Sequence, residues 1–278
     1  MIGQNSTADW LQFRIPIESG SGWYYFSVAR RTITLAHDQL QMAKNFYGRY
    51  GKRWLDAAAS AAGLVVLSPL LLGVAIAVRL SSPGPVLFRQ VRTGRFGRPF
   101  RIFKFRTMIE DAVCPGNLVT AGDDLRITRL GRWLRKTKID ELPQLINVLL
   151  GEMSVVGPRP EISEYTENYS EKYRRLLLAR PGITGPAATA YVREEEILAG
   201  QADRENFYAA EILPRKLELD LIYCEDIRFF DDIKLIFHTF RKIFETFRPA
   251  GRDVEGGEPV GQFYDCGDRE NAHCGAPQ

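Results

Sequence analysis

Apolar residues run from Ala57 to Val78 without a single charge, whereas the rest of the chain mixes polar and apolar positions. A helix of this run would reach roughly 33 Å at about 1.5 Å per residue, which is enough to cross the hydrocarbon core of a bilayer. Ser68 and Pro69 interrupt the run near its middle. Proline removes a backbone hydrogen bond, and a neighbouring serine hydroxyl can bond the carbonyls that are freed. The pattern therefore predicts a membrane helix with a break.

Basic residues flank this run on both sides. Arg49, Lys52 and Arg53 precede it, and a series of positive residues that begins with Arg79 follows it. Positive residues mark the cytoplasmic side of a membrane, so both ends belong on that side. This favours a re-entrant helix, within residues 51–82, that enters and leaves through one leaflet. A straight spanning helix with a proline kink and the buried core helix of a soluble protein stay open as alternatives.

The remaining pattern predicts a mainly α fold with a small β-hairpin. The hairpin strands are Val86–Phe88 and Phe100–Arg106, with the segment Gly94–Gly97 between them. A strand is expected at Trp23–Val28. Helical spacing over 231–247 alternates isoleucine and phenylalanine with basic residues, which fits either a core-facing or a membrane-surface helix. Further helices are predicted over 38–47, 123–151 with a new start at about Asp140, 162–178, 194–200 and 206–226, and a loop or short extended piece over 183–191.

The predicted organisation has a re-entrant membrane helix and interfacial amphipathic helices around a compact cytoplasmic domain. Residues 1–50 form an N-terminal extension that lacks the features of a secretory signal. The re-entrant helix takes residues 51–82, the cytoplasmic domain 83–247, and a disordered tail rich in Gly, Pro and charge 248–278.

Composition narrows the class of protein. The chain has 278 residues, 45% hydrophobic and 26% charged, with mean hydropathy −0.20 and net charge +3. These values exclude a disordered, collagen-like or polytopic membrane protein. Seven positive residues and no acid lie between Arg89 and Arg106, which suits a polyanion or lipid headgroups. Nucleic acid is not expected, because the basic run adjoins a membrane segment. Cys266, His273 and Cys274 cluster without the fourth ligand that a metal site needs.

Asp140 and Glu141 form a carboxylate pair at a predicted helix start, beside Arg135, Lys136 and Lys138. A helix N-terminus favours phosphate, an ionised Asp there can attack phosphorus, and an adjacent Glu can hold Mg²⁺. The alternative is that the two acids simply stabilise the start of a helix.

Three further cations are candidates for binding phosphate. Arg159 stands between two prolines, which holds it stiffly for a bidentate grip, although a solvated turn arginine would look the same. Lys104 and Arg106 alternate with phenylalanines and are expected on one face of a strand. Their alternative is an ordinary amphipathic edge strand.

Several motifs in this order resemble those of the bacterial sugar transferases, the monotopic phosphoglycosyl transferases that begin glycan assembly on a lipid carrier. The resemblance covers about residues 50–245. The motifs are Lys52-Arg53-Trp54-Leu55-Asp56, Ser68-Pro69, Ser82-Pro83-Gly84-Pro85-Val86, Phe103-Lys104-Phe105-Arg106-Thr107-Met108, Ile139-Asp140-Glu141-Leu142-Pro143-Gln144, Met153-Ser154-Val155-Val156-Gly157-Pro158-Arg159-Pro160 and Arg180-Pro181-Gly182-Ile183-Thr184-Gly185.

The resemblance implies an enzyme that transfers a sugar 1-phosphate from a UDP-sugar to undecaprenyl phosphate and releases UMP. Asp140 matches the nucleophile that forms a covalent phosphosugar intermediate, and Glu141 the carboxylate that is linked to Mg²⁺. Arg135 and Arg159 match phosphate-binding arginines, and Ser68-Pro69 the break of the re-entrant helix. The implied location is one leaflet of the bacterial inner membrane, at its cytoplasmic face. The resemblance leaves open whether the chain forms a homodimer.

The sugar is not determined by these motifs. Pro186-Ala187-Ala188 stands where the family often has Trp-Ala-Gln, and the segment Arg193–Arg215 is longer than in the shortest members. Two other functions stay open: a membrane-anchored glycosyltransferase that releases UDP, and a non-enzymatic protein that binds the membrane surface.

Overall fold

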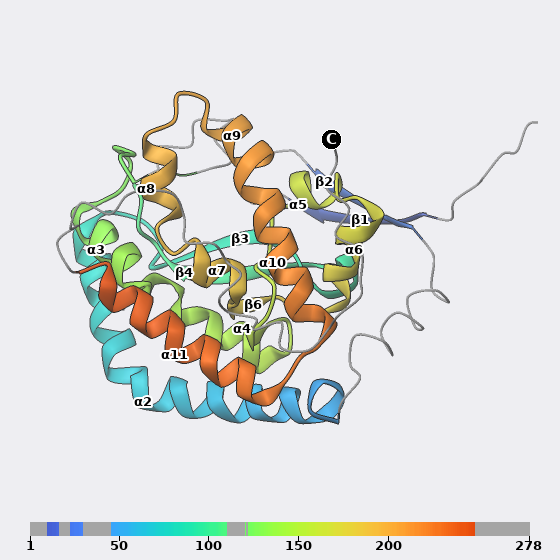
Figure 1. Ribbon diagram of the computed structural model, residues 1–278. Coiled ribbons are helices and arrows are strands. Elements are labelled where there is room, and N and C mark those ends of the chain that lie inside the picture. The colour runs from blue at the N-terminus through green and yellow to red at the C-terminus, as the bar shows by residue number, and fades with distance from the viewer. Residues whose placement is uncertain (1–9, 17–22, 30–45, 110–119, 121, 248–278) are drawn as a thin grey trace, which may run out of the picture. The chain divides into compact units, whose positions relative to one another are not determined.

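The computed structural model describes residues 10–16, 23–29, 46–109, 120 and 122–247 (Figure 1). The chain divides into two compact units after Phe247, and all described residues lie in the first unit. The predicted tail over 248–278 and most of the predicted helix over 38–47 fall outside the described residues. So do the cysteine and histidine residues of the C-terminal cluster.

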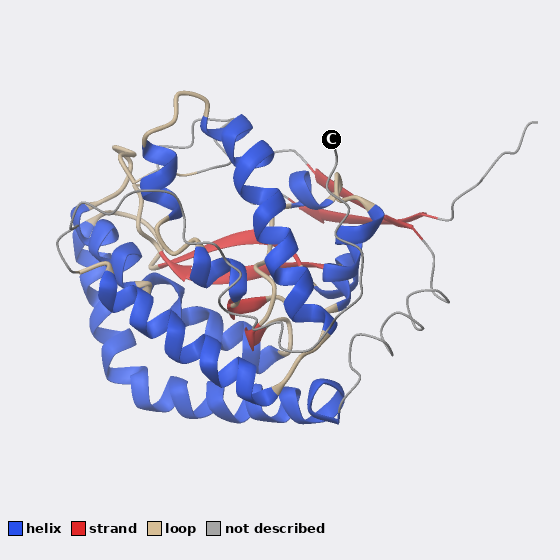
Figure 2. Cartoon of the chain, in the orientation of Figure 1, coloured by secondary structure: helices blue, strands red, loops and turns tan. Residues whose placement is uncertain are grey.

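Helices make up most of the described chain, and the strands form three separate two-stranded sheets (Figure 2). The mainly α prediction is confirmed. The strands are β1 (Trp10–Pro16), β2 (Trp23–Ala29), β3 (Leu87–Thr93), β4 (Pro99–Phe105), β5 (Ser154–Val156) and β6 (Gly182–Thr184). The helices are η1 (Tyr47–Gly51), α2 (Lys52–Ser81), η2 (Arg95–Gly97), α3 (Arg129–Thr137), η4 (Ile139–Gln144), α4 (Leu145–Leu150), α5 (Ser163–Thr166), α6 (Glu171–Arg174), η5 (Arg175–Leu178), α7 (Pro186–Ala190), α8 (Glu194–Ala199), α9 (Arg204–Phe207), η6 (Tyr208–Ile212), α10 (Leu213–Glu225) and α11 (Phe229–Glu245).

Helix α2 contains the predicted apolar run. Pro69 lies inside it, and the Ser68 hydroxyl donates a hydrogen bond to the Val65 carbonyl oxygen at 2.7 Å. Figure 1 shows that the ribbon of α2 bends partway along its length. A proline that removes a backbone hydrogen bond accounts for such a bend.

The surface of α2 is mostly exposed. Among the described residues it is the one helix long and apolar enough to span a membrane, and only 11% of its most apolar window is buried. Val65 and Val66 are about three-quarters exposed, at 74% and 75%. Val74 and Val78, nearer the end, are buried against Phe105. This exposure argues against the buried core helix of a soluble protein.

The predicted hairpin is confirmed in β3 and β4, which pair antiparallel from Leu87 opposite Phe105 to Thr93 opposite Pro99. Strand β3 extends further than Phe88, so the connection is shorter than predicted. The turn includes Gly97 at φ 70°, a left-handed conformation that glycine adopts readily. Phe100 and Ile102 of β4 pack into a core cluster with Val148 and Met153.

Strands β5 and β6 form a short parallel pair that the sequence did not predict. Ser154 lies opposite Gly182, and Val156 opposite Thr184. A Cβ atom at Gly182 would lie 2.2 Å from the backbone nitrogen of Gly157, so the close approach requires glycine here. Over 183–191 the sequence predicted a loop or short extended piece. The extended piece is confirmed in β6, whereas Pro186–Ala190 form the helix α7.

The continuous helix predicted over 162–178 is wrong. This segment forms three short helices, α5, α6 and η5. Ser170, immediately before α6, has an extended ψ of 162°, which breaks the helical path. The interruption leaves Tyr169 buried in the main core cluster, against α10 residues such as Leu217. Burial of this aromatic ring offsets the loss of helical hydrogen bonds.

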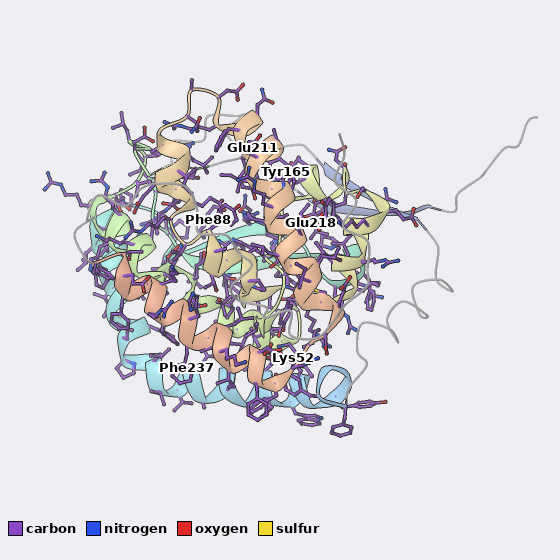
Figure 3. All side chains as sticks on the ribbon, in the orientation of Figure 1. Lys52, Phe88, Tyr165, Glu211, Glu218 and Phe237 are labelled. Atoms are coloured by element: carbon purple, nitrogen blue, oxygen red, sulfur yellow. The ribbon has the colours of Figure 1, made fainter. Side chains whose placement is uncertain are left out.

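The last predicted helix is confirmed as α11, and its apolar positions divide between two environments. Leu235 and Ile236 pack against the main core, whereas Phe230, Phe237 and Phe244 are exposed at 73%, 72% and 71%. A core-facing helix alone would not leave these rings in water. Figure 3 labels Phe237, which belongs to this exposed set.

Candidate functional site

The acidic pair lies where α3 gives way to η4. Thr128 caps α3, its hydroxyl accepting a hydrogen bond from the Gly131 backbone at 2.9 Å, and Lys138 ends the helix with a left-handed φ of 57°. Asp140 and Glu141 follow directly, in the first turn of η4, and both are buried. The predicted regular helix start at Asp140 is thus corrected to a 3₁₀ turn, and the α-helix begins later, at Leu145.

Two cations hold Glu141. Its Oε1 accepts a hydrogen bond from Lys104 Nζ at 2.9 Å and one from Arg159 Nη2 at 2.9 Å. Burial by itself would raise the pKa of Glu141, but the charges of Arg159 and Lys104 keep that pKa well below its usual range. Glu141 is therefore ionised at neutral pH and fixed in position.

Asp140 is less well partnered. Its Oδ1 is buried and has no hydrogen-bond partner among the described residues. Burial, followed by the negative charge of Glu141, raises the pKa of Asp140 to about 6, and nearby Lys104, Lys138 and Arg135 oppose that rise. At neutral pH the carboxylate is ionised with a lone pair unengaged. Such a group is suited to attack an electrophilic phosphorus.

Arg159 is held by a carboxylate that the sequence did not single out. The Arg159 backbone N–H donates to Asp220 Oδ2 at 3.0 Å, and Asp220 Oδ1 accepts from the Ala187 backbone at 3.1 Å. Burial raises the pKa of Asp220 to about 7. Asp220 lies in a charge-rich helical segment where no local signal separates it from surface acids.

A buried polar cluster continues beyond Arg159. Lys216 Nζ donates to Glu194 Oε2 and to the Tyr208 hydroxyl, both at 2.9 Å, and lies 3.3 Å from Glu161 Oε1. The Tyr208 hydroxyl donates to Glu161 at 2.9 Å. Burial would raise the pKa of Glu161, but Lys216 and Arg92 lower it. These contacts fix the segment that carries Arg159.

Arg135 lies near the acidic pair but has other partners. Its Nε donates to the Thr107 hydroxyl at 2.9 Å, and its Nη1 donates to Glu195 Oε1 at 3.0 Å. Its charge still acts on Asp140, whose pKa it helps to lower. Neither Thr107, which lies within one of the matched motifs, nor Glu195 was predicted to orient it.

Lys104 and Arg106, predicted to bind phosphate from one face of a strand, contact different partners in the structure. Strand β4 ends at Phe105, and Arg106 Nη2 donates to the Ser82 carbonyl at 2.6 Å and to the Ser82 hydroxyl at 3.0 Å. Arg106 thus holds the end of α2, whereas Lys104 reaches Glu141. Arg106 Nε and Nη1 are buried without a partner among the described residues. Ser68 and Pro69 lie on α2 and are not part of the acidic cluster.

Asp140 and Glu141 offer the carboxylate oxygens that Mg²⁺ prefers as ligands. Within the described ranges no group of three or more His, Cys, Asp or Glu side chains is placed to hold a metal. Mg²⁺ is commonly held by one or two carboxylates together with substrate phosphates and water. Lys104 and Arg159 both bond Glu141 Oε1, and Asp140 Oδ1 is unpartnered. Two adjacent carboxylates could therefore share in holding a Mg²⁺ ion whose other ligands are water and phosphate oxygens.

Comparison with known proteins gives a consistent result. Residues 47–246 match the family model described as bacterial sugar transferase. The sugar transferase EpsL of Bacillus subtilis is 41% identical, over 69% of this chain and 86% of its own length. The UDP-N-acetylgalactosamine-undecaprenyl-phosphate N-acetylgalactosaminephosphotransferase of Aeromonas hydrophila is 36% identical over 70% of this chain. The UDP-glucose:undecaprenyl-phosphate glucose-1-phosphate transferase of Klebsiella pneumoniae is 39% identical over 69%. The matched segment spans 44% and 40% of these last two proteins.

Proposed function

We propose a reaction for this chain from the fact that it belongs to the bacterial sugar transferase family. The chain transfers a sugar 1-phosphate from a UDP-sugar to undecaprenyl phosphate and releases UMP. Two relatives are named for transfers of this kind, with different sugars. The proposal rests on one observation: the buried carboxylate of Asp140 has an oxygen without a hydrogen-bond partner among the described residues, and it lies beside Glu141, which is bound by cations.

The proposed chemistry has two displacements at one phosphorus. A carboxylate oxygen of Asp140 attacks the phosphorus that bears the sugar, and the bond from that phosphorus to the oxygen bridging to UMP breaks. UMP leaves with the bonding electron pair, and an acyl phosphosugar remains on Asp140. A phosphate oxygen of undecaprenyl phosphate then attacks the same phosphorus. The Asp140–phosphorus bond breaks, which yields the diphosphate-linked sugar and frees the carboxylate.

The surrounding side chains would serve this chemistry by position and charge. Phosphoryl transfer depends mainly on cations and alignment, since negative charge spreads over the phosphoryl oxygens. Arg159 and Lys104 would bind phosphate oxygens while they hold Glu141 in place. Arg135, oriented by Glu195, would bind a further phosphate oxygen. Glu141 with Asp140 would hold Mg²⁺, which supplies positive charge to the phosphates.

The membrane arrangement is part of the proposal. The bend in α2, its exposed apolar surface and the exposed rings of Trp54 and Phe230 suit a helix that enters and leaves the cytoplasmic leaflet of the inner membrane. Cysteines introduced at positions 45 and 98 test it in intact spheroplasts. Both should resist labelling from outside by a membrane-impermeant reagent, and labelling of only one would contradict a re-entrant helix.

The reaction is tested by nucleotide release from a panel of UDP-sugars, with undecaprenyl phosphate as acceptor. We expect UMP from the wild-type chain, a radiolabelled sugar phosphate bound covalently when acceptor is omitted, and loss of both in Asp140→Asn. Arg215→Gln, which changes an exposed arginine paired with Glu211, is the matched control and should retain activity. Release of UDP would indicate a glycosyltransferase instead, and unchanged function in Asp140→Asn would indicate a binding protein.

A further inference from the structure

A polar cavity of about 80 Å³ lies at the start of α2. Gly157 and Pro158, immediately before Arg159, are among the residues that line it. Its volume is large enough for several water-sized groups. The ionisable and hydroxyl side chains that line it include Lys52, Arg53, Asp56, Arg95, Ser154 and Arg180.

Three arginines at this cavity bond backbone carbonyls. Arg53 donates to Val148 O at 2.6 Å and to Leu149 O at 2.9 Å. Arg95 Nε donates to the carbonyl of residue 178 at 2.8 Å, and Arg180 Nε to that of residue 151 at 3.1 Å. None of the three forms an ion pair with another described residue. The terminal nitrogens of Arg95 and Arg180 are left without hydrogen bonds to the described part of the chain.

The acidic groups beside the cavity already have partners. Asp56 accepts hydrogen bonds from the Ser154 hydroxyl at 2.6 Å and from the Val155 backbone at 3.2 Å. Lys52, labelled in Figure 3 at the start of α2, is paired with Asp232. Asp232 also accepts a hydrogen bond from Tyr223 at 2.7 Å. The cavity therefore carries more positive than negative charge.

The arginines are also close enough to repel one another. Burial, together with the charge of Arg180, lowers the pKa of Arg95. Burial and the charge of Arg53 lower the pKa of Arg180, which nearby Asp56 partly opposes. Grouping like charges in a partly buried cavity is unfavourable unless an anion neutralises them.

We propose that this cavity binds a phosphate oxyanion through the terminal nitrogens of Arg95 and Arg180, at a site separate from the acidic pair. The guanidinium group matches phosphate oxygens in bidentate geometry. The proposal does not depend on the proposed reaction. The phosphate can come from a lipid headgroup or from solution. A headgroup is within reach because Trp54, 79% exposed, stands on the same turn of α2 as Arg53, and exposed tryptophans lie at membrane interfaces.

Thermal unfolding of the full chain in detergent, titrated with inorganic phosphate at constant ionic strength, tests the proposal. In Arg95→Gln we expect the phosphate concentration for half-maximal stabilisation to rise about tenfold, as loss of one charge-assisted hydrogen bond implies. Arg215→Gln should match the wild type. Phosphate bound at the acidic pair contributes equally to all three proteins, so the comparison isolates the cavity. Equal midpoints in Arg95→Gln and the wild type would overturn the proposal.

A second measurement covers the case in which Arg95→Gln does not fold. Crystals of the wild-type chain soaked in tungstate should show an anomalous peak between Arg95 and Arg180. A peak near Asp140 with none in the cavity would refute the site.

The source of the phosphate is resolved with vesicles of phosphatidylglycerol. If Arg95→Gln weakens binding both to inorganic phosphate and to these vesicles, the site takes a headgroup. If it weakens binding to inorganic phosphate alone, the site takes free phosphate. Both results support the site, and an unchanged affinity for both ligands contradicts it.

Discussion

The structure contains two groups of half-buried cations, and the two groups have different kinds of partner. Around the acidic pair, Lys104 and Arg159 face a carboxylate, that of Glu141. At the cavity beside α2, Arg53 and Arg180 face backbone carbonyls. A carboxylate cancels the charge of a cation, whereas a carbonyl only orients it. Together with the neighbouring Asp140, whose charge also interacts with Lys104, Glu141 balances the two cations of the first region before any substrate binds. The second region retains its positive charge.

This difference indicates two uses of the same residue type. Ion pairing at the acidic pair fixes the geometry in which phosphates would be received, and it keeps Glu141 ionised. Carbonyl bonding at the cavity ties together segments distant in sequence, as when Arg53 joins α2 to the end of α4. Cations near a helix C-terminus also interact favourably with the helix dipole.

The largest expected effect on the free energy of unfolding comes from removing the carboxylate that pairs with Lys104 and Arg159. Glu141→Gln removes the buried carboxylate and leaves the half-buried Lys104 and Arg159 without their counter-charge, so we expect a loss of about 3–5 kcal/mol in the free energy of unfolding. Urea denaturation in detergent measures it. The matched control is Glu195→Gln, which removes the partly exposed pair with Arg135 and should cost about 0–1 kcal/mol. Equal losses in the two variants would contradict the difference in burial.

The next substitution, at Asp140, is expected to raise the free energy of unfolding instead of lowering it. Because the pKa of Asp140 is raised to about 6, the folded chain binds this proton more tightly than the unfolded chain. The resulting stability is present below pH 4 and is lost as pH rises through about 6. Asp140→Asn avoids that loss, so above pH 6 it should be about 1–3 kcal/mol more stable than the wild type. Denaturation from pH 4 to pH 8 measures the gap, and a gap that did not widen with pH would refute the explanation.

The smallest expected effect on the free energy of unfolding comes from a substitution at the cavity beside α2. Arg53→Gln removes two hydrogen bonds to carbonyls at the end of α4 but leaves no carboxylate unpaired, so the expected loss is about 1–2 kcal/mol. Urea denaturation measures it, with Arg215→Gln as control. A loss as large as that of Glu141→Gln would show that this arginine has a charged partner after all.

The spacing of apolar residues along the chain correctly predicted three elements of the fold. The apolar run of α2, the alternating hairpin and the amphipathic α11 follow directly from residue spacing. The acidic pair and Arg159 were identified as candidates, and the structure brings them together through Glu141. Whether Asp140 is the nucleophile stays a prediction.

The features that were missed depend on contacts between distant residues. Strands of three residues, such as β5 and β6, are too short for alternation to be visible. The break at Ser170 reflects burial of Tyr169, which no local propensity encodes. The contact of Arg106 with Ser82 was also missed, because Ser82 lies 24 residues earlier in the chain. Asp220 is recognisable only once the Arg159 turn packs onto α10.

Helix α2 cannot be treated as a removable anchor. Val78 completes the core around Phe105, Asp56 bonds the strand β5, and Lys52 pairs with α11. Truncation before residue 82, a common way to obtain soluble enzymes, would remove all three of these contacts. A chimera that exchanged α2 for an unrelated membrane segment would meet the same obstacle. The apolar helix α2 and the part of the chain that would perform chemistry share these contacts, so a change in one is expected to affect the other.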